Sequence, residues 1–382
     1  MTQQINAEHK RTLMLYWLAK LINDLYNPPG FDVFKFITFR AGMAAVTSLI
    51  VGLWLGPKFI AYLKKMQIGE EITKDGPQSH FSKAGTPTMG GLIVLTSILT
   101  GTLLWMDLSN LYVWLMILAI VWMGTVGFID DYLKCVKKYN KGLIARYKIL
   151  GQVTLGLIIG LVVSFHPDFA GNVSKTTIPF LKNATLDYGW FYIPVVIFII
   201  TAVSNAVNLT DGLDGLAIGV TGIVMIPMAV MAYFTGNIKF ANYLEIIYLP
   251  GSGELTIITL AIIGASLGFL WYNSNPAQVF MGDTGSLALG SALGVLAILI
   301  KKELFLPLIA GVFLMETISV IIQRMYFKYT KKKYGEGRRV FRMAPIHHHF
   351  ELLGWPETKI VTRFWIIAII LSLGTLALLK LR

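Results

Sequence analysis

Ten apolar stretches dominate this chain, each close to the roughly 18 residues that a helix needs to cross a bilayer. Lipid offers the backbone no hydrogen-bond partners, and the stretches lack the alternation of a barrel strand, so they predict spanning helices. Hydrophobic residues make up 55% of the sequence and charged residues only 14%, as in a membrane protein. We predict an all-α integral membrane protein in which residues 1–382 form a single polytopic domain with ten transmembrane helices, at 38–58, 91–106, 111–129, 149–165, 190–206, 215–234, 255–272, 285–300, 304–322 and 361–379.

The orientation follows from the distribution of Lys and Arg among the connecting loops. Together with the flanking Lys58 and Arg363, the loops on one side carry 21 of the 33 basic residues. We take that side as the inner one, and its loops are 59–90, 130–148, 207–214, 273–284 and 323–360. Both termini are then predicted on the outer (periplasmic) side, and every acidic cluster is predicted on the inner side.

The net charge of +12 does not require a nucleic-acid partner, and none is predicted. Most of the excess lies in loops that face an anionic leaflet of the membrane, and it also suits anionic substrates. The single Cys135 excludes an internal disulfide. Residues 1–36 form an outer segment in which Leu13–Leu25 predicts an amphipathic helix on the membrane surface, and residues 323–360 form the longest inner loop.

A polar stretch, Asn205-Ala-Val-Asn-Leu-Thr-Asp-Gly-Leu-Asp-Gly215, separates two of the spans. Polar groups at membrane depth are expensive and by default mark a functional site. Asn205, Asn208, Asp211 and Asp214 are therefore candidate functional residues. Asp211 and Asp214 would share one face if the segment were helical. The structural alternative is that Asp214 caps the next helix while Asn208 and Asp211 make turn hydrogen bonds.

Two adjacent carboxylates, Asp130 and Asp131, follow the third predicted span. A helix C-terminus disfavours negative charge, and neighbouring carboxylates repel each other, so a divalent cation or a nearby basic residue should compensate them. Lys134 lies four residues beyond Asp130, near enough to pair with it if the helix continues. Lys148 opens the fourth span, where it can face the interior. The alternative is that the two acids form a solvated helix end and that both lysines only anchor the chain at the lipid headgroups.

The first inner loop, Asp75–Gly91, is rich in glycine and proline and therefore predicts tight turns. Its Lys83 and Thr88 offer an ammonium and a hydroxyl just before the second span, a place suited to phosphate oxygens. An ordinary polar loop, with a lysine that reaches for the membrane interface, is the alternative.

Asp283 is the only acid in the connection Trp271–Ser286 and stands directly before the eighth span. It is either an N-cap or a metal ligand, and the surrounding Asn273, Gln278 and glycines favour the second. Magnesium takes one or two protein carboxylates and completes its octahedron with waters and substrate phosphates. Asp283 with Asp130 or Asp131 meets that need, so Mg²⁺ is the predicted cofactor and Asp283 its predicted ligand.

The ninth span ends at Gln323, and the loop that follows contains His347, His348 and His349. Neighbouring side chains of an extended chain point in different directions, so three consecutive histidines rarely share one metal ion. Imidazoles can instead donate to a pyrophosphate or accept a proton near neutral pH. We predict one or two of the three in the site and a structural role for at least one.

Together these motifs resemble those of the phospho-N-acetylmuramoyl-pentapeptide transferases, a family of the polyprenyl-phosphate N-acetylhexosamine-1-phosphate transferase superfamily. The resemblance runs from Phe39-Arg40 to the final span. The Ala-Pro-Ile-His-His-His run and Gly354-Trp-Pro-Glu357 are similar to the muramoyl-pentapeptide branch in particular. The other matching motifs are Ser82–Gly91, Phe128-Ile-Asp-Asp-Tyr132, Asn205–Gly215 and Pro276–Asp283.

The resemblance implies a multi-pass enzyme of the bacterial inner membrane that transfers phospho-N-acetylmuramoyl-pentapeptide from UDP to undecaprenyl phosphate. Its products would be lipid I, for peptidoglycan and cell-wall synthesis, and UMP. A Mg²⁺ requirement, ten transmembrane helices, a cytoplasmic active site and a homodimer are implied as well. Asp283 would bind Mg²⁺, and Asp130 or Asp131 would deprotonate the lipid phosphate.

The candidate site residues fall into two groups. The candidate catalytic residues are Asp130, Asp131, Asp283 and His347. The candidate substrate-binding residues are Lys83, Thr88, Lys134, Lys148, Asn205, Asn208, Asp211, Asp214, Asn273, Phe280, Gln323, His348 and His349.

We expect the lipid phosphate to attack the sugar-proximal phosphorus directly, with Lys83 and a histidine balancing charge on UMP. Phe280 either stacks on uracil or is a buried membrane aromatic. A two-step route through an aspartyl-phosphate is the mechanistic alternative. One rival function is a sister transferase that moves GlcNAc-1-phosphate. The other is a cation-coupled transporter, whose acids would lie near the bilayer midplane, whereas carboxylates at predicted span ends favour the enzyme.

Overall fold

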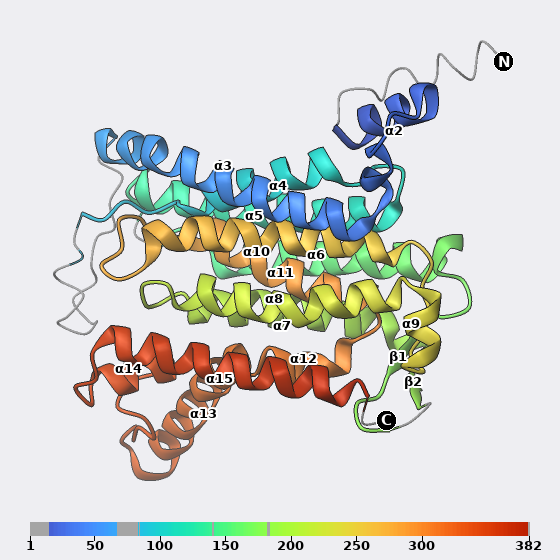
Figure 1. Ribbon diagram of the computed structural model, residues 1–382. Helices are drawn as coiled ribbons and strands as arrows, with labels where there is room; N and C mark the ends of the chain where they lie inside the picture. The colour runs from blue at the N-terminus through green and yellow to red at the C-terminus, as the bar shows by residue number, and fades with distance from the viewer. Residues whose placement is uncertain (1–14, 67–82, 84, 140, 182–183, 381–382) are drawn as a thin grey trace.

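The helices lie side by side in an elongated bundle (Figure 1). The computed structural model describes residues 15–66, 83, 85–139, 141–181 and 184–380. α2 and the end of α15 lie at one end of the bundle and α14 lies at the other (Figure 1). The helices are α2 Leu15–Tyr26, α3 Ile37–Lys65, α4 Gly91–Trp105, α5 Leu111–Cys135, α6 Ala145–Phe165, α7 Tyr192–Thr210, α8 Leu216–Thr235, α9 Ile238–Tyr243, α10 Leu255–Asn273, α11 Gly282–Leu299, α12 Leu306–Ile309, α13 Gly311–Tyr334, α14 Ile346–Glu351 and α15 Glu357–Leu378.

Every predicted apolar stretch overlaps one of these helices, so the prediction of a helical membrane protein is confirmed. Within the described residues, eight helices are long and apolar enough to span a membrane. The stretch predicted at 304–322 is instead a broken pair, α12 and α13, bent by 81° around Ala310. α4 has only 15 residues. The count of ten spans and the side on which the termini lie therefore stay predictions.

A short β-hairpin departs from the all-α prediction. Strand β1 (Lys175–Thr177) pairs antiparallel with β2 (Thr185–Asp187). The hairpin lies at the same end of the bundle as α2 and α9 (Figure 1). There the Lys302 ammonium donates to Thr177 Oγ1 at 2.9 Å, which fastens the hairpin to the chain just before the broken span.

α11 is the central helix of the bundle. Every residue from Thr284 to Leu299 is buried, and α4, α5, α7 and α8 pack around them. Glycines allow this close packing. A Cβ at Gly290 would lie 2.7 Å from Ser204 Cα on α7, so the two backbones are nearly in contact. Close packing on several sides fixes where α11 begins, and the acidic residues meet at that point.

Two helix ends differ from the sequence prediction. α5 continues to Cys135 rather than ending at 129, so Asp130 and Asp131 lie inside its last turns. α7 ends at Thr210, and the residues after it form a turn, so Asp211 and Asp214 do not share a helix face. The surface helix predicted at Leu13–Leu25 corresponds to α2, and residues 13 and 14 of that prediction lie outside the described residues.

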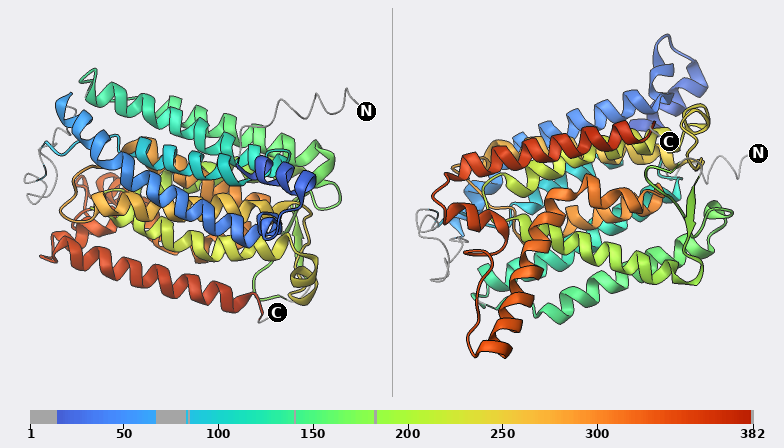
Figure 2. Two further views of the ribbon diagram at one scale, coloured as in Figure 1. Left: turned by 45° about the horizontal axis from the view of Figure 1, so that its top comes forward. Right: turned by 90° about the horizontal axis from the view of Figure 1, so that it is seen from below.

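α13 leans away from the rest of the bundle (Figure 2). Ile318, Ile321 and Met325 on this helix are exposed, and Lys331–Lys333 form its last turn. An apolar helix flank that does not pack against protein is suited to lipid. A groove lies between α13 and α15, where α13 departs from the bundle.

Candidate active site

Three carboxylates that are far apart in the sequence converge at the start of α11. Asp130 and Asp131 project from α5, and Asp283 stands in the first turn of α11. One oxygen of each carboxylate lies within 4.8 Å of the others. Asp130 and Asp131 are buried, whereas the side chain of Asp283 is 16% exposed. The three acids thus meet, as the sequence predicted, and Asp283 is the one most accessible to a ligand.

Two lysines neutralise these acids. Lys134 Nζ lies 2.5 Å from Asp130 Oδ2 and 3.6 Å from Asp283 Oδ2. Lys148 enters from α6, 2.9 Å from Asp130 Oδ2, and also contacts Asp283 Oδ2. The predicted pairing of Lys134 with Asp130 is therefore present, and Lys148 faces the interior. Within the described residues, three carboxylates thus face two ammonium groups, so the cluster has one more acid than base and can accept a further cation.

Asp131 has a different role from its neighbour Asp130. Its Oδ1 accepts from the backbone N–H of Asp283 at 3.0 Å. Its Oδ2 accepts from the backbone N–H and the hydroxyl of Thr284, at 2.9 and 2.6 Å. Backbone donors in the first turn of a helix have no partner within that helix. Asp131 therefore caps α11 from α5, and the N-cap role considered for Asp283 is not observed.

Hydrogen bonds fix Asp130 and Asp283 from two further directions. Asp130 Oδ1 accepts from the backbone N–H of Leu143 at 2.7 Å. Asn208 on α7 donates to Asp283 Oδ1 at 2.9 Å and to Ser286 Oγ at 2.8 Å. Helices α5, α6, α7 and α11 thus each contribute to one preorganised centre.

Gly127 lets α5 approach α11 closely enough to form this centre. A Cβ at Gly127 would lie 2.2 Å from the backbone oxygen of Asp283 and 2.6 Å from the nitrogen of Thr284. Any side chain at this position must displace the start of α11. The acid cluster therefore depends on a glycine one turn before the acids themselves.

The donor set of the cluster fits a magnesium ion. Mg²⁺ prefers carboxylate oxygens and water, and Asp130 and Asp283 present carboxylate oxygens to each other. The ammonium of Lys148 lies against Oδ2 of both, so a positive charge already stands where a divalent ion would be attracted. Both oxygens of Asp131 are committed to α11. Asp283 and Asp130 are therefore the residues suited to hold the ion.

A second charged cluster surrounds Lys83, which precedes α4. Its Nζ lies 2.7 Å from Asp214 Oδ1 and 2.7 Å from Glu357 Oε1. Burial alone would lower the pKa of Lys83, but its hydrogen bonds to the two carboxylates outweigh burial and raise that pKa above its ordinary value. Asn275 donates to both carboxylates at 3.1 Å. Lys83 is thus a permanent cation held between two acids.

Sequence reasoning missed Glu357 and Asn275 as members of this cluster. Glu357 begins α15 and also accepts from the backbone N–H of Asp214 at 2.6 Å. The available signal was an acid in the first turn of a span, on the side where the other acids gather. Asn275 lies in the turn between α10 and α11, next to a proline. Both reach Asp214 through the packing of distant segments, which no local pattern encodes.

Two candidates, Asn273 and Phe280, connect the loops around the clusters, and a third, Thr88, is buried in one of these loops. Asn273 donates to the carbonyl of Val279 at 2.9 Å and accepts from the N–H of Gly215 at 3.0 Å. The backbone N–H of half-buried Phe280 donates to Pro87, in the loop that carries buried Thr88. The loops before α4, α8 and α11 therefore form one connected unit.

Other candidates make their described contacts with the protein itself. Asn205 donates to Gln152 Oε1 at 2.9 Å, one helical turn before Asn208. Gln323 donates to the carbonyl of Phe341 at 2.9 Å and accepts from the N–H groups of Val340 and Phe341, which fastens that loop to α13. Asp211 follows the last residue of α7. A substrate-binding role for Asn205, Asp211 and Gln323 stays a prediction.

The three histidines lie on the short helix α14 rather than in an extended chain, so they face different partners. His347 is buried, with Nδ1 3.2 Å from Oε2 of Glu316 on α13. His348 Nδ1 lies 2.6 Å from Glu351 Oε2. His349 Nδ1 accepts from the backbone N–H of Arg342 at 3.1 Å. Their separate surroundings agree with the expectation that the three do not bind one metal ion together.

Comparisons with known proteins agree on one family. A family described as "Glycosyl transferase family 4" matches residues 113–301, which include the acids of α5 and α11. "Phospho-N-acetylmuramoyl-pentapeptide-transferase signature 1" matches residues 83–95. Curated relatives named phospho-N-acetylmuramoyl-pentapeptide-transferase are similar over 369 residues, or 97% of this chain and 100% of each relative. The identity is 59% for Chloroherpeton thalassium, 57% for Chlorobium phaeobacteroides and 56% for Pelodictyon phaeoclathratiforme.

Proposed function

The chain belongs to the phospho-N-acetylmuramoyl-pentapeptide-transferase family, and from this premise we propose the reaction that it catalyses. It transfers phospho-N-acetylmuramoyl-pentapeptide from the UDP-linked precursor to undecaprenyl phosphate, giving lipid I for peptidoglycan synthesis. An oxygen of the lipid phosphate bonds to the sugar-proximal phosphorus, the bond between that phosphorus and the UMP oxygen breaks, and UMP leaves. The observation that carries the proposal is the cluster of acids and lysines at the start of α11, in a chain with a relative at 59% identity along nearly its whole length.

We propose Mg²⁺ as the cofactor, held by Asp283 and Asp130. When bound, it would neutralise charge on the two phosphates of the UDP-sugar. The surrounding residues then have separate tasks. Asn208 orients Asp283, and Asp131 keeps it at the start of α11. Lys134 and Lys148, which contact the same carboxylates, are placed to bind incoming phosphate oxygens.

Asp130 is better suited to act as an electrostatic anchor than as a nucleophile. Its Oδ2 lies between Lys134 and Lys148, and its Oδ1 accepts from Leu143. A phosphate monoester is also largely ionised near pH 7, so a general base has little to remove. These features support direct attack by the lipid phosphate. Trapping a radiolabelled adduct on the enzyme with UDP-sugar alone would contradict direct attack and support the two-step route.

We assign the cluster around Lys83 to the nucleotide end of the substrate. Lys83 is charged, and it lies in the connected loops that also carry Phe280. Its ammonium would balance negative charge on the departing UMP. The UMP would compete for this ammonium with the carboxylates of Asp214 and Glu357. The half-buried ring of Phe280 is suited to stack on uracil.

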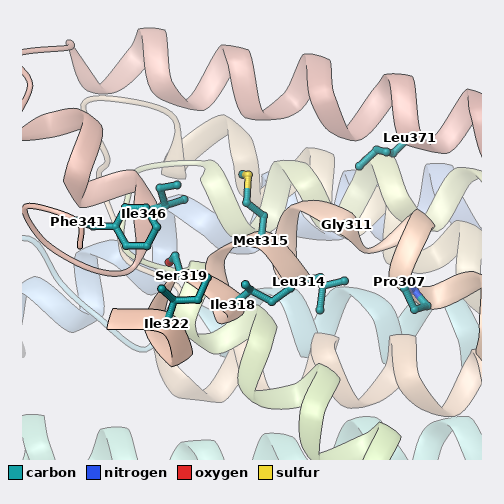
Figure 3. Close-up of a pocket in the computed structure, with 10 residues that line it drawn as sticks. All are labelled: Pro307, Gly311, Leu314, Met315, Ile318, Ser319, Ile322, Phe341, Ile346 and Leu371. Atoms are coloured by element: carbon teal, nitrogen blue, oxygen red, sulfur yellow. The ribbon is translucent and has the colours of Figure 1, made fainter. Parts of the chain in front are cut away.

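An apolar groove is available for the isoprenoid chain of the lipid (Figure 3). It encloses about 420 Å³ and is lined along α13 by Leu314, Met315 and Ile318, with Leu371 of α15 opposite. Phe341 and Ile346 line it towards α14 (Figure 3). We propose that the chain lies in this groove with its phosphate directed to α14, because the lining is almost entirely hydrocarbon and His347 follows Ile346 directly.

We further propose that the acids face the cytoplasm, because the loops at that end of the bundle carry most of the basic residues. Both termini would then be periplasmic. A cysteine replacing Lys137 on a Cys135→Ser background should react with a membrane-impermeant maleimide in inverted vesicles and not in intact cells, and the reverse result would contradict this orientation.

The homodimer implied by the family would double the protein mass measured by light scattering in detergent, whereas a monomer mass would argue against it.

Gly127→Ala should damage the active site without touching a catalytic group. Because its Cβ would collide with the backbone of Asp283, we expect turnover to fall by about 100-fold, the effect of misplacing a reacting group by about 1 Å. Gly374→Ala is the matched control, since a Cβ there meets open space. UMP release at saturating substrate measures both. Equal turnover in the two variants would contradict the close-packing account.

The deciding experiment is UMP release from purified protein given undecaprenyl phosphate and each candidate UDP-sugar, with and without Mg²⁺. We expect release with UDP-MurNAc-pentapeptide and Mg²⁺, and none with UDP-GlcNAc. Turnover of UDP-GlcNAc alone would favour the sister transferase. Solute flux in proteoliposomes without UMP release would favour a cation-coupled transporter.

A further inference from the structure

Glu316 is a carboxylate buried in the middle of an otherwise apolar part of α13. The residues around it, 312–322, include no other charged group. The side chain of Glu316 has no exposed surface, and neither of its oxygens accepts a hydrogen bond of good geometry from the described residues. Burying a carboxylate at membrane depth is costly, so such a group is a functional candidate by default. None of the roles proposed above uses it.

The carboxylate of Glu316 lies beside His347. His347 Nδ1 lies 3.2 Å from Glu316 Oε2, and the imidazole is fully buried as well. The other ring nitrogen faces away from α13: a Cβ at Gly212 would lie 2.4 Å from His347 Nε2. The ring is therefore held between a carboxylate on one side and the turn between α7 and α8 on the other. That turn carries Asp214, the partner of Lys83.

We propose that Glu316 is the positioning residue for His347 in the transferase reaction. A carboxylate beside Nδ1 favours a proton on that nitrogen and fixes the orientation of the ring. Nε2 of His347 then faces the turn that borders the cluster around Lys83. Glu316 acts through His347 and touches no substrate itself. This inference rests on the proposed function, because only the transferase reaction gives a task to His347, a candidate catalytic residue from the sequence.

The position of Glu316 also connects the groove to the site. Met315 and Ser319, its neighbours on α13, line the groove proposed for the isoprenoid chain. Ile346, which precedes His347, lines the same groove. The Glu316–His347 contact therefore ties the groove helix to the helix that carries the histidine. A purely structural role would predict that Glu316 only holds α13 against α14, and kinetics can separate the two roles.

The test is a double-mutant cycle on UMP release with Glu316→Gln, His347→Gln and the double variant, in purified full-length protein. Residues that act as a unit show non-additive losses. We expect Glu316→Gln to lower kcat by about tenfold or more, with the KM for the UDP-sugar changed by less than about twofold. In the His347→Gln background, Glu316→Gln should lower kcat no further. If the loss in kcat of the double variant equalled the product of the two single losses, the proposal would be overturned.

Glu303→Gln is the matched control for losing a buried carboxylate from the same broken span. Glu303 accepts from the hydroxyls of Thr176 and Tyr192, next to the β-hairpin. We expect this variant to lose thermal stability while keeping kcat. If Glu316→Gln behaved in the same way, with kcat intact, Glu316 would be structural only. Should Glu316→Gln fail to fold, Glu316→Asp replaces it in the cycle. The losses in kcat are again expected to be non-additive, and losses that multiply would again overturn the proposal. Absence of UMP release from the wild-type protein would overturn the proposed function, whereas an active wild type with multiplying losses overturns only this inference.

Discussion

Asp283→Asn is expected to remove nearly all turnover while leaving the protein folded. Asparagine has the shape of aspartate but no charge, so it is a much weaker ligand for Mg²⁺ and a weaker partner for Lys148. The start of α11 should persist, because Asp131 binds the backbone of residue 283 and not its side chain. We expect a loss of about 100- to 1,000-fold in turnover, the size found for single electrostatic groups in active sites. UMP release at varied Mg²⁺, together with a melting curve in detergent, measures both effects.

Asp187→Asn is the matched control for this substitution. Asp187 is exposed in β2, at the end of the bundle opposite α14, and hydrogen-bonds to Ser174 and Gly189. Turnover of Asp187→Asn should equal that of the wild type. If Asp283→Asn also released UMP at nearly the wild-type rate, Asp283 would have to be removed from the metal role.

Lys148→Met should weaken both catalysis and the fold, and Mg²⁺ should restore part of the stability. The substitution leaves Asp130 and Asp283 with Lys134 as the one remaining ammonium of the described cluster. Removing one partner of a fully buried ion pair costs about 3–5 kcal/mol. The side chain of Lys148 is 20% exposed, so we expect about 2 kcal/mol. Turnover should fall by about 100-fold, because this ammonium is also assigned to the incoming phosphate oxygens.

The response to Mg²⁺ separates this account from simple destabilisation. A divalent ion between Asp130 and Asp283 would replace the missing positive charge, so added Mg²⁺ should raise the melting temperature of Lys148→Met more than that of the wild type. Lys137→Met, an exposed position between α5 and α6, is the control and should match the wild type in turnover and stability. A Mg²⁺ response equal in all three proteins would argue against a metal between these two acids.

The parts of the fold that the sequence predicts are those encoded by nearby residues. Each apolar stretch becomes a helix because lipid leaves the backbone no other way to satisfy its hydrogen bonds. The pairing of Lys134 with Asp130 follows from four-residue spacing once the helix is known to continue. That continuation to Cys135 was not predicted, since the apolar pattern ends at 129 while the helix does not.

The remaining parts depend on tertiary packing. The sequence did not reveal that Asp131, a candidate catalytic acid, caps α11, a helix 151 residues further along the chain, and its catalytic role stays a prediction. Glu357 and Asn275 join Lys83 only because their segments meet in space. Glu316 was detectable as a lone carboxylate in an apolar span, yet its partner His347 could not be foreseen. The 81° bend before α13 was also missed, because apolar length alone does not show that a span is broken.

The most direct test of the account is the environment of Mn²⁺, used in place of Mg²⁺, in purified protein with UDP-MurNAc-pentapeptide. Electron paramagnetic resonance reports whether the ion is bound to the protein, and its coupling to phosphorus reports whether the ion contacts the diphosphate. We predict bound Mn²⁺ with phosphorus coupling in the wild type, and loss of the bound ion in Asp283→Asn at the same concentrations. Equal binding of Mn²⁺ to both proteins, or binding without phosphorus coupling, would contradict the claim that these acids hold a metal-bound diphosphate.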